Sequence, residues 1–484
     1  MVRRNYALEL RSAATFPLAA ALAEGTFTGV VASKYFHAGP LLIAVITAAP
    51  MFGNILALFW SELAEDRRKV PFINVLQIGL VAAMALVGLT VFLPVETGAA
   101  GVAFAGLIIV ARVLASGVVT LRSAVWRLNY PRALRAQLIG RIQGVNNTVL
   151  AAMVLVAAFA LDARPAVYAV LYPIVALISL FGVLSFSRVR VRGERALLRR
   201  ARLLPAAVGD DEAMDTFGGA TPDYRRVVRD KVVGSPLGRL AARFRDAFKL
   251  LGEDRMFREY QWWQFILGIS FMMMFPSLIY IVSTEMTDPR TQYVLAVFVV
   301  QFVPMVTGVV FLQLWAPLFD RVDLLRFRVY MGSVSLLAHV LILAGAVTDS
   351  LWIIGAGMFA VGASMGGGQL AWQLGQNAFA TRETVGRYMG LHVMLTGIRG
   401  MFAPFVGVGI YHLLNRYVAS AGLTDAPGGR WVFLASVTAA AVGLVGYVGM
   451  SRKYRAEILA RDDALTDAVP TPPVPSPRAV AAET

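Results

Sequence analysis

Residues 126–144 read WRLNYPRALRAQLIGRIQG, and residues 372–390 read WQLGQNAFATRETVGRYMG. The two stretches share a tryptophan, a leucine and a Gly-Arg-x-x-Gly run at the same spacing. They lie 246 residues apart, about half the length of the 484-residue chain. A match at half length predicts that the chain consists of two copies of one structural unit.

A second pair of similar stretches supports the repeat. Residues 60–65 read WSELAE and residues 315–320 read WAPLFD, at an offset of 255 residues. This pair follows the second apolar segment of each half, and the first pair follows the fourth. The two offsets differ because loops in the two halves differ in length. Chance explains either pair alone, but two pairs at matched positions favour a true duplication.

Apolar segments indicate what each unit is made of. Of all residues, 57% are hydrophobic and only 15% are charged, and the mean hydropathy is +0.64. Soluble proteins have about 25% charged residues, and a helix of about 20 apolar residues spans a bilayer. We therefore predict an all-α polytopic membrane protein with twelve transmembrane helices in two six-helix bundles, related by a pseudo-two-fold axis. The segments lie near 13–36, 40–61, 71–93, 99–120, 143–161, 165–186, 260–283, 292–315, 327–347, 350–372, 388–413 and 431–450.

The apolar segments divide the chain into five parts. A short N-terminal segment precedes the first bundle, a basic linker joins the two bundles, and a proline-rich tail follows the second. The composition of the tail is typical of disorder. The expected boundaries are 1–12, 13–186, 187–259, 260–450 and 451–484.

The start of the chain also has features of a cleaved signal peptide. Arg3, Arg4 and Arg11 precede an apolar stretch, and residues 21–23 (ALA) are similar to a cleavage site. The apolar stretch continues to Phe36, however, which is too long for a typical signal peptide, and cleavage would leave eleven spans. We therefore favour a retained first helix.

The positive charge of the chain indicates how it lies in the membrane. Lys and Arg number 45 against 30 Asp and Glu, a formal net charge of +15 that also suits nucleic-acid binding. With twelve spans, the termini and every second loop share one side, which holds 38 of the 45 cations, against five on the opposite side. This asymmetry predicts cytoplasmic termini in a multi-pass protein of the cytoplasmic (inner) membrane, and no nucleic-acid partner. The cation-rich loops are 62–70, 121–142, 187–259, 320–328 and 382–387.

The linker contains an amphipathic pattern. Apolar residues recur every three or four positions between Leu237 and Leu251, with basic residues around them. The pattern predicts a basic helix that lies on the anionic inner leaflet. A calmodulin-type partner site is the alternative interpretation.

The two sets of six spans, the long basic central loop and the loop stretches together resemble the major facilitator superfamily of secondary transporters. Members carry a G-x-L-x-D-R-x-G-R-R-like run between helices 2 and 3, often echoed between helices 8 and 9. Residues 316–321 (APLFDR) are the closer copy and residues 61–69 (SELAEDRRK) a degenerate one, and neither copy has the glycines. Residues 381–391 (TRETVGRYMGL) look like the family's loop before helix 11. The resemblance covers about 13–450 and implies a substrate site between the two halves.

Charged residues inside the spans are the first candidates for function, because a charge in hydrocarbon costs about 2.5 kcal/mol or more. They are Glu24, Arg112 and Arg399. The resemblance implies that Glu24 and Arg112 line the central cavity, and residues 109–117 (IVARVLASG) resemble the family's helix-4 arginine motif, often tied to proton coupling. A carboxylate in such a cavity takes up a proton more readily than in water, whereas a nearby arginine opposes this. A coupling site and a fixed interhelix ion pair both remain open.

Helix 11 carries a polar stripe. His392, Thr396 and Arg399 lie on one helix face, and the offset of 246 aligns His392 with Asn146, next to Asn147, in helix 5. Arg399 offers a guanidinium fork to a carboxylate or phosphate. Interhelix hydrogen bonding is an equal alternative for Asn146, Asn147 and His392. A metal site at His392 is disfavoured, because the chain has four His and no carboxylate at ligand spacing.

Charged residues of matched loops predict a cytoplasmic gate. Acidic and basic side chains from the loops between helices 2 and 3 and between helices 8 and 9 would face the arginines of the Gly-Arg-x-x-Gly runs. Their pairs would form in the outward-open state and separate when the protein opens inward. The alternative is a solvated basic loop, in which exposed pairs contribute about 0–1 kcal/mol. The gate residues are Glu65, Asp66, Arg141, Asp320, Arg321 and Arg387.

Together these patterns predict a secondary active transporter for a small, anionic or amphipathic solute, coupled to protons and acting as a monomer. A membrane enzyme would need a His or carboxylate cluster near the interface, or a globular domain, and the loops supply neither. The absence of cysteine excludes disulfides, thiolate metal sites and cysteine nucleophiles. No metal or cofactor is expected. A transport-inactive assembly factor or sensor with the same fold is the alternative.

Overall fold

The computed structural model describes residues 1–64, 67–95, 98–130, 132–194, 245, 248–380, 385–421, 428–454, 456 and 457. Every regular element within these ranges is a helix. Within the described part of the chain, eleven helical segments are long and apolar enough to cross a membrane, and the apolar stretch Pro40–Leu56 adds a shorter twelfth. The predicted all-α fold with twelve spans is therefore confirmed. The amphipathic pattern of the linker up to residue 244 and the proline-rich tail lie outside the described residues.

The first half contains six spans, the first of them made of three short helices. The helices are α1 (Val2–Thr15), α2 (Pro17–Leu22), α3 (Gly25–Lys34), α4 (Pro40–Leu63), α5 (Lys69–Val87) with η1 (Gly88–Phe92), α6 (Ala99–Asn129), α7 (Arg132–Ala163), η2 (Pro165–Val167) and α8 (Tyr168–Ser187).

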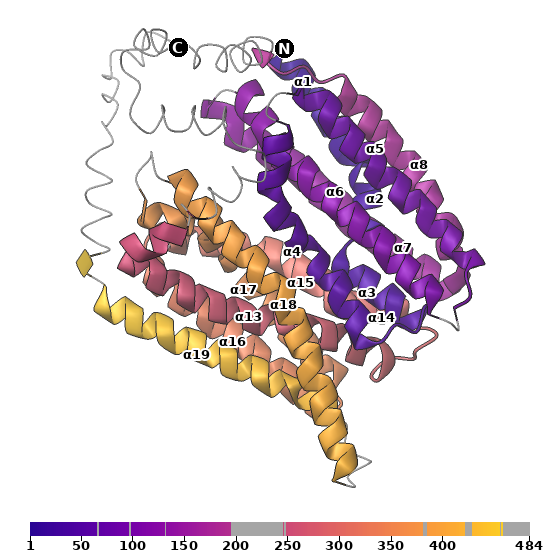
Figure 1. The fold of residues 1–484 in the computed structure, drawn as a ribbon, viewed down its shortest axis with the longest axis vertical. Coiled ribbons are helices and arrows are strands. Elements are labelled where there is room, and N and C mark those ends of the chain that lie inside the picture. Colours follow the sequence, from indigo (N-terminus) through magenta and orange to yellow (C-terminus); the bar gives the residue numbers. More distant parts are fainter. Residues whose placement is uncertain are drawn as a thin grey trace.

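The second half contains the other six spans. The helices are α13 (Arg255–Thr284), α14 (Tyr293–Val297) with η3 (Phe298–Phe302) and α15 (Val303–Phe319), α16 (Leu324–Val347), α17 (Leu351–Leu374) with η4 (Gly375–Ala378), α18 (Val385–Ser420), η5 (Gly428–Trp431) and α19 (Val432–Lys453). Figure 1 shows the two halves side by side, the first in indigo to magenta and the second in pink to yellow.

The first helix begins at Val2, well before the predicted start of the span at residue 13. The reason is that polar residues of α1 are buried and find partners in the fold. Asn5 donates a hydrogen bond to the backbone oxygen of Arg190 at 2.7 Å, and Glu9 is fully buried. Hydropathy alone does not detect a helix whose polar side is satisfied in this way.

The first span is interrupted in its middle. Pro17 starts α2 and lacks an N–H, and α2 ends at Leu22. Glu24 then takes an extended backbone conformation, with φ −67° and ψ 126°, before α3 begins. The interruption places the Glu24 carboxylate at the start of a new helix, within the span.

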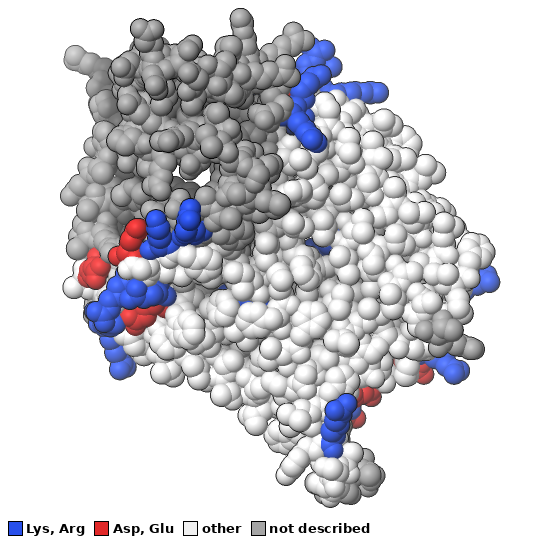
Figure 2. Space-filling view, in the orientation of Figure 1, with Lys and Arg blue, Asp and Glu red and all other residues white. Residues whose placement is uncertain are grey.

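Surface composition agrees with a membrane environment. Large apolar side chains such as Val75, Phe181 and Leu314 are exposed on the outer helix faces. In the view of Figure 2, charged side chains of the described surface gather toward its edges, around a broad uncharged area. Such a surface is suited to contact with lipid.

The two halves meet closely from the middle of the molecule to one of its ends. We call the end that holds Met1 the N-terminal face and the end that holds Lys34 the opposite face. In the middle, Gly397 and Gly400 of α18 pack against Ile55 and Met51 of α4, and a Cβ at Gly400 would lie 2.1 Å from Met51. Small residues at these positions let the two helices approach each other.

At the opposite face, polar contacts join the two halves. Lys34 of α3 donates hydrogen bonds to Thr287 Oγ1 at 2.9 Å and to the backbone oxygens of Asp288 and Thr291 at 2.5 and 2.8 Å. The Asp162 carboxylate of α7 accepts from the backbone N–H groups at the start of α14, at 2.5 and 3.0 Å. A carboxylate at a helix N-terminus is favourably placed. The halves are thus tied together at this face.

Candidate functional site

Two adjoining cavities lie between the halves, near the middle of the spans. Their volumes are about 370 and 310 Å³, and both are lined by Met51 of α4, Phe271 and Met272 of α13, and Met365 of α17. Most of the wall is apolar, and a few polar and charged side chains project from it. A largely apolar cavity with few polar groups is typical of small-molecule sites.

Glu24 and Arg112 form an ion pair in the smaller cavity. Arg112 Nη1 donates a hydrogen bond of 3.0 Å to Glu24 Oε2, and the two side chains are 19% and 29% exposed. Arg112 Nε is buried and has no hydrogen-bond partner among the described residues. The helix break presents Glu24, and the middle of α6 presents Arg112, so the structure brings together the two residues named from the sequence.

Arg399 lines the larger cavity. Its guanidinium lies against α13, where Nη1 donates to the backbone oxygen of Gln264 at 2.5 Å. Gly268 makes this possible, because a Cβ at that position would lie 2.0 Å from Arg399 Cζ. Arg399 Nε is buried, and no other described residue forms a hydrogen bond with it.

The residues of the polar stripe on α18 lie in two environments, the larger cavity and the protein interior. Thr396 lines the larger cavity beside Trp372, whose Nε1 donates to Thr396 Oγ1 at 3.4 Å. His392 is fully buried, with Nδ1 3.1 Å from Gln261 Oε1, and it lines neither cavity. In the described part of the chain, no three His, Asp or Glu side chains are placed to hold a metal ion.

Asn146 and Asn147 do not share the environment of His392, although the repeat aligns Asn146 with it. Asn146 is half-buried and Asn147 is exposed, and the Asn146 amide donates to Asn147 Oδ1 at 3.4 Å. Neither asparagine lines the two cavities. The structure therefore does not bring this pair to the charged residues of the cavities.

The predicted gate residues that the structure describes are not paired. Arg141, Asp320 and Arg321 are exposed, and none of them forms an ion pair with another described residue. Glu65, Asp66 and the side chain of Arg387 lie outside the described residues.

The charge count placed Arg328 in the 320–328 loop, and the structure corrects this. Arg328 is only 2% exposed and lines the larger cavity. Its Nε and Nη2 donate to Tyr260 Oη at 2.9 and 2.5 Å, Nη2 also donates to the backbone oxygen of Ala371 at 3.1 Å, and Tyr447 stacks nearby at 5.9 Å. The sequence did contain a sign of this burial, because Arg328 lies after residue 327, where the predicted apolar segment begins.

Arg122, also counted with a loop, is buried in the first half. It forms an ion pair of 3.5 Å with the fully buried carboxylate of Glu9. Tyr130 Oη donates to the same carboxylate at 2.8 Å, and Trp126 Nε1 donates to it as well. This cluster joins α1 to α6, and it explains why the helix extends to Val2.

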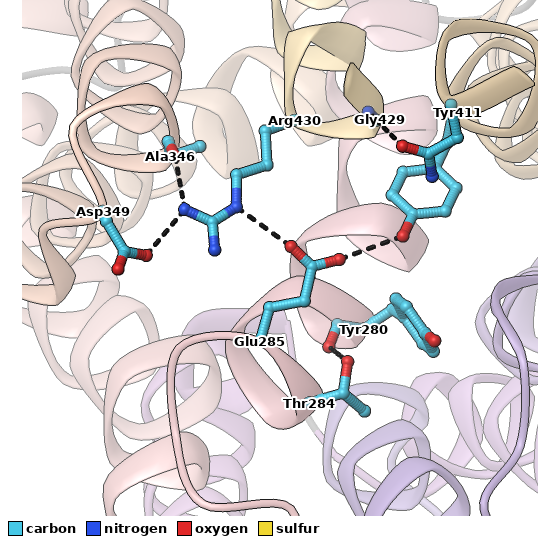
Figure 3. A network of polar contacts seen from close by, with 9 residues as sticks. Tyr280, Thr284, Glu285, Ala346, Asp349, Tyr411, Gly429 and Arg430 are labelled. Carbon is cyan, nitrogen blue, oxygen red and sulfur yellow. Dashed lines mark hydrogen bonds and ion pairs between the residues drawn. The ribbon is translucent and has the colours of Figure 1, made fainter. Parts of the chain in front are cut away.

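A further buried arginine, Arg430, lies at the opposite face of the second half (Figure 3). Arg430 donates to Glu285 at 2.9 Å and to Asp349 at 2.6 Å, and Tyr411 Oη donates to the other oxygen of Glu285 at 3.0 Å. The network ties the end of α13 to the α16–α17 turn, α18 and η5. It holds the second half together at that face and makes no contact with the cavities.

Comparison with known proteins identifies the family. The sequence model of the Major Facilitator Superfamily matches residues 14–404, and no curated protein matches the sequence. Among solved structures, the nucleoside transporter NupG has a TM-score of 0.59 at 11% identity, over 93% of this chain and 98% of that chain. The inward-open xylose transporter XylE from E. coli has a TM-score of 0.58 at 11% identity, over 93% and 95% of the two chains.

A third structure is a bacterial homolog of the human lysosomal transporter Spinster, in an inward-facing and unoccupied conformation. It has a TM-score of 0.62 at 14% identity, over 94% of this chain and 98% of that chain. At such identities the likeness to the solved structures is one of fold, whereas the family match covers most of the sequence. The chain belongs to the major facilitator superfamily, whose members are membrane transporters.

Proposed function

We propose that the protein is a secondary active transporter that moves a small solute across the cytoplasmic membrane by alternating access, coupled to protons through Glu24. The observation that carries the proposal is the ion pair of Glu24 and Arg112 in a cavity between the two halves. The solved structures of the same fold include a D-xylose–proton symporter.

The position of the pair supports a coupling role. Glu24 accepts a charged hydrogen bond from Arg112, yet its side chain is 29% exposed toward the cavity. A solute or proton that arrives from the cavity meets the carboxylate directly. Protonation of Glu24 would leave Arg112 without its counter-charge, so proton binding and solute binding would be coupled through a shared ion pair.

The charge distribution supports an orientation with the N-terminal face in the cytoplasm. In that orientation Lys34 and Asp162 hold the outer side closed, whereas the gate residues that the structure describes on the inner side, Arg141, Asp320 and Arg321, form no ion pair with another described residue. This is the arrangement of an inward-facing transporter. The gate prediction then requires Arg141, Asp320 and Arg321 to find partners when the inner side closes.

The test uses purified protein in proteoliposomes and a broad panel of radiolabelled solutes, with and without an imposed pH gradient. We expect at least one solute to accumulate when the gradient is applied. The Glu24→Gln variant should lose accumulation driven by the gradient but retain solute exchange. Glu194→Gln is the matched control, because Glu194 pairs with Arg68 outside both cavities.

Two results would contradict the proposal in different ways. Coupling at the wild-type level in Glu24→Gln removes Glu24 as the proton site. Failure of every gradient to drive flux of any solute in the panel favours a transport-inactive role as an assembly factor or sensor.

A further inference from the structure

The described buried arginines fall into two groups. Arg122 and Arg430 each form an ion pair with at least one carboxylate. Arg328 and Arg399 are as deeply buried, at 2% and 5% exposure, and neither forms an ion pair with a described residue. Arg328 and Arg399 of the second half therefore differ from the other buried arginines in having no described carboxylate partner.

The partners of these two arginines are neutral. Arg328 donates to the Tyr260 hydroxyl and to a backbone oxygen, and Arg399 donates to the backbone oxygen of Gln264. Both guanidinium groups are positively charged and line one cavity, so each raises the cost of burying the other. Hydroxyl and carbonyl oxygens satisfy donors but supply no negative charge, and a buried charge without a counter-charge costs several kcal/mol.

Both arginines line the same cavity of about 370 Å³. No hydrogen bond to another described residue is made by Arg328 Nη1, by Arg399 Nη2 or by Arg399 Nε, and the last of these atoms is buried. The two guanidinium groups thus bring donor capacity and positive charge to a cavity between the halves, where an alternating-access transporter binds its solute.

We propose that Arg328 and Arg399 bind the oxyanion group, a carboxylate or phosphate, of an amphipathic organic anion that the protein transports. This assignment rests on the proposed transport function. A guanidinium presents paired N–H donors that match the oxygens of a carboxylate or phosphate, and a bound anion supplies the missing counter-charge. The cost of the two buried cations is then offset only when the solute is bound, which makes the site selective for anions.

The rest of the cavity indicates the other end of the solute. Beyond the arginines, most of the exposed wall is apolar, and six polar side chains interrupt it: Asn54, Gln264, Ser335, Ser364, Gln369 and Thr396. A solute with one anionic group and an apolar body therefore fits this lining better than a polyol does. The apolar wall includes Met51, Leu267, Phe271, Met272, Met331 and Met365.

The test measures anion accumulation at the cavity and needs no knowledge of the natural solute. Trp372 lines the cavity, so its fluorescence reports on small quenchers that enter it. Iodide is the anionic probe, caesium the cationic probe and acrylamide the neutral probe. The contribution of Trp372 is the difference between the full-length protein and its Trp372→Phe variant, both reconstituted in nanodiscs.

We expect iodide to quench Trp372 more strongly than caesium does. The ratio of the iodide to the acrylamide quenching constant should fall about threefold or more in Arg399→Gln and in Arg328→Gln, because each variant removes a nearby positive charge. Arg328→Lys retains the charge and should therefore retain most of the iodide-to-acrylamide ratio. This variant keeps the test valid if Arg328→Gln does not fold. Arg326→Gln is the matched control, since it removes the same charge from a half-exposed side chain on the same helix.

Equal quenching by iodide and caesium, or an unchanged ratio in a folded Arg399→Gln variant, would overturn the anion site and assign both arginines a purely structural role. The quenching does not depend on flux. If the wild-type protein concentrates iodide but transports no solute, the transport function alone is refuted. If it transports only neutral solutes and shows no preference for iodide, the anion site alone is refuted.

Discussion

The guanidinium of Arg399 occupies the space that a side chain at Gly268 would fill. A Cβ at that position would lie 2.0 Å from Cζ, 2.1 Å from Nη1 and 2.3 Å from Nε of Arg399. The arginine therefore lies directly on the backbone of α13, from which it takes the Gln264 oxygen as acceptor. Arg399 of α18 thus contacts α13 at the cavity because Gly268 has no side chain there.

Gly268→Ala tests this relationship without removing any charge. The added methyl group should displace the guanidinium and break its hydrogen bond to Gln264, and a hydrogen bond to a charged group contributes about 1.5–3 kcal/mol. We expect the affinity for a transported anion to fall about tenfold, measured by uptake kinetics in proteoliposomes. Gly355→Ala in α17 is the control, because a Cβ there meets no atom within 4 Å. Equal effects of the two substitutions would contradict the positioning of Arg399 by Gly268.

Lys34→Met should weaken the closure of the opposite face. Lys34 donates three hydrogen bonds to residues of the second half, and it is only 2% exposed. Loss of these bonds should destabilise the conformer described here by about 1.4 kcal/mol or more, which shifts its population about tenfold. Distances between spin labels on the two halves at that face report the shift. Lys453→Met is the control, because Lys453 bonds to Glu259 within the second half. Unchanged label distances in Lys34→Met would exclude Lys34 as a latch.

Glu9→Gln should destabilise the first half. The substitution leaves the buried Arg122 without its counter-charge, and breaking a buried ion pair costs about 3–5 kcal/mol. We expect a lower midpoint of thermal unfolding in detergent, and partial recovery in the double variant Glu9→Gln/Arg122→Met, in which no charge is left unpaired. A midpoint that falls further in the double variant would argue against this explanation. Glu194→Gln, which affects a pair with the exposed Arg68, should change the midpoint little.

Asp320→Arg tests the predicted gate at the N-terminal face. Asp320 and Arg141 lie on different halves, are exposed and form no ion pair with another described residue, so the substitution should leave the stability unchanged. It should disfavour the closed state of that face, and the exchange variant Asp320→Arg/Arg141→Asp should restore closure. Crosslinking between α7 and α15 at that face, followed together with transport rate, measures both effects. If neither variant alters crosslinking or transport, the loops are merely solvated.

The sequence was sufficient for the spans, the repeat and the family, because these depend on local composition and on spacing along the chain. It also identified Glu24, Arg112 and Arg399, because a charge within an apolar run is visible without any knowledge of the partner. The charge count failed for Arg328 and Arg122, because both lie near the end of a span. Whether such a residue is solvated or buried depends on residues elsewhere in the chain, such as Tyr260 for Arg328 and Glu9 for Arg122.

Only the tertiary structure decided which charges are paired. Arg112 and Arg399 look alike in the sequence, each a single arginine in an apolar helix, yet one meets Glu24 and the other meets a backbone oxygen. Packing also separated His392 from Thr396 and Arg399, because the first faces the interior of the second half and the others face the cavity. Helical periodicity places residues on a face, whereas the neighbour of that face is set by contacts between distant segments.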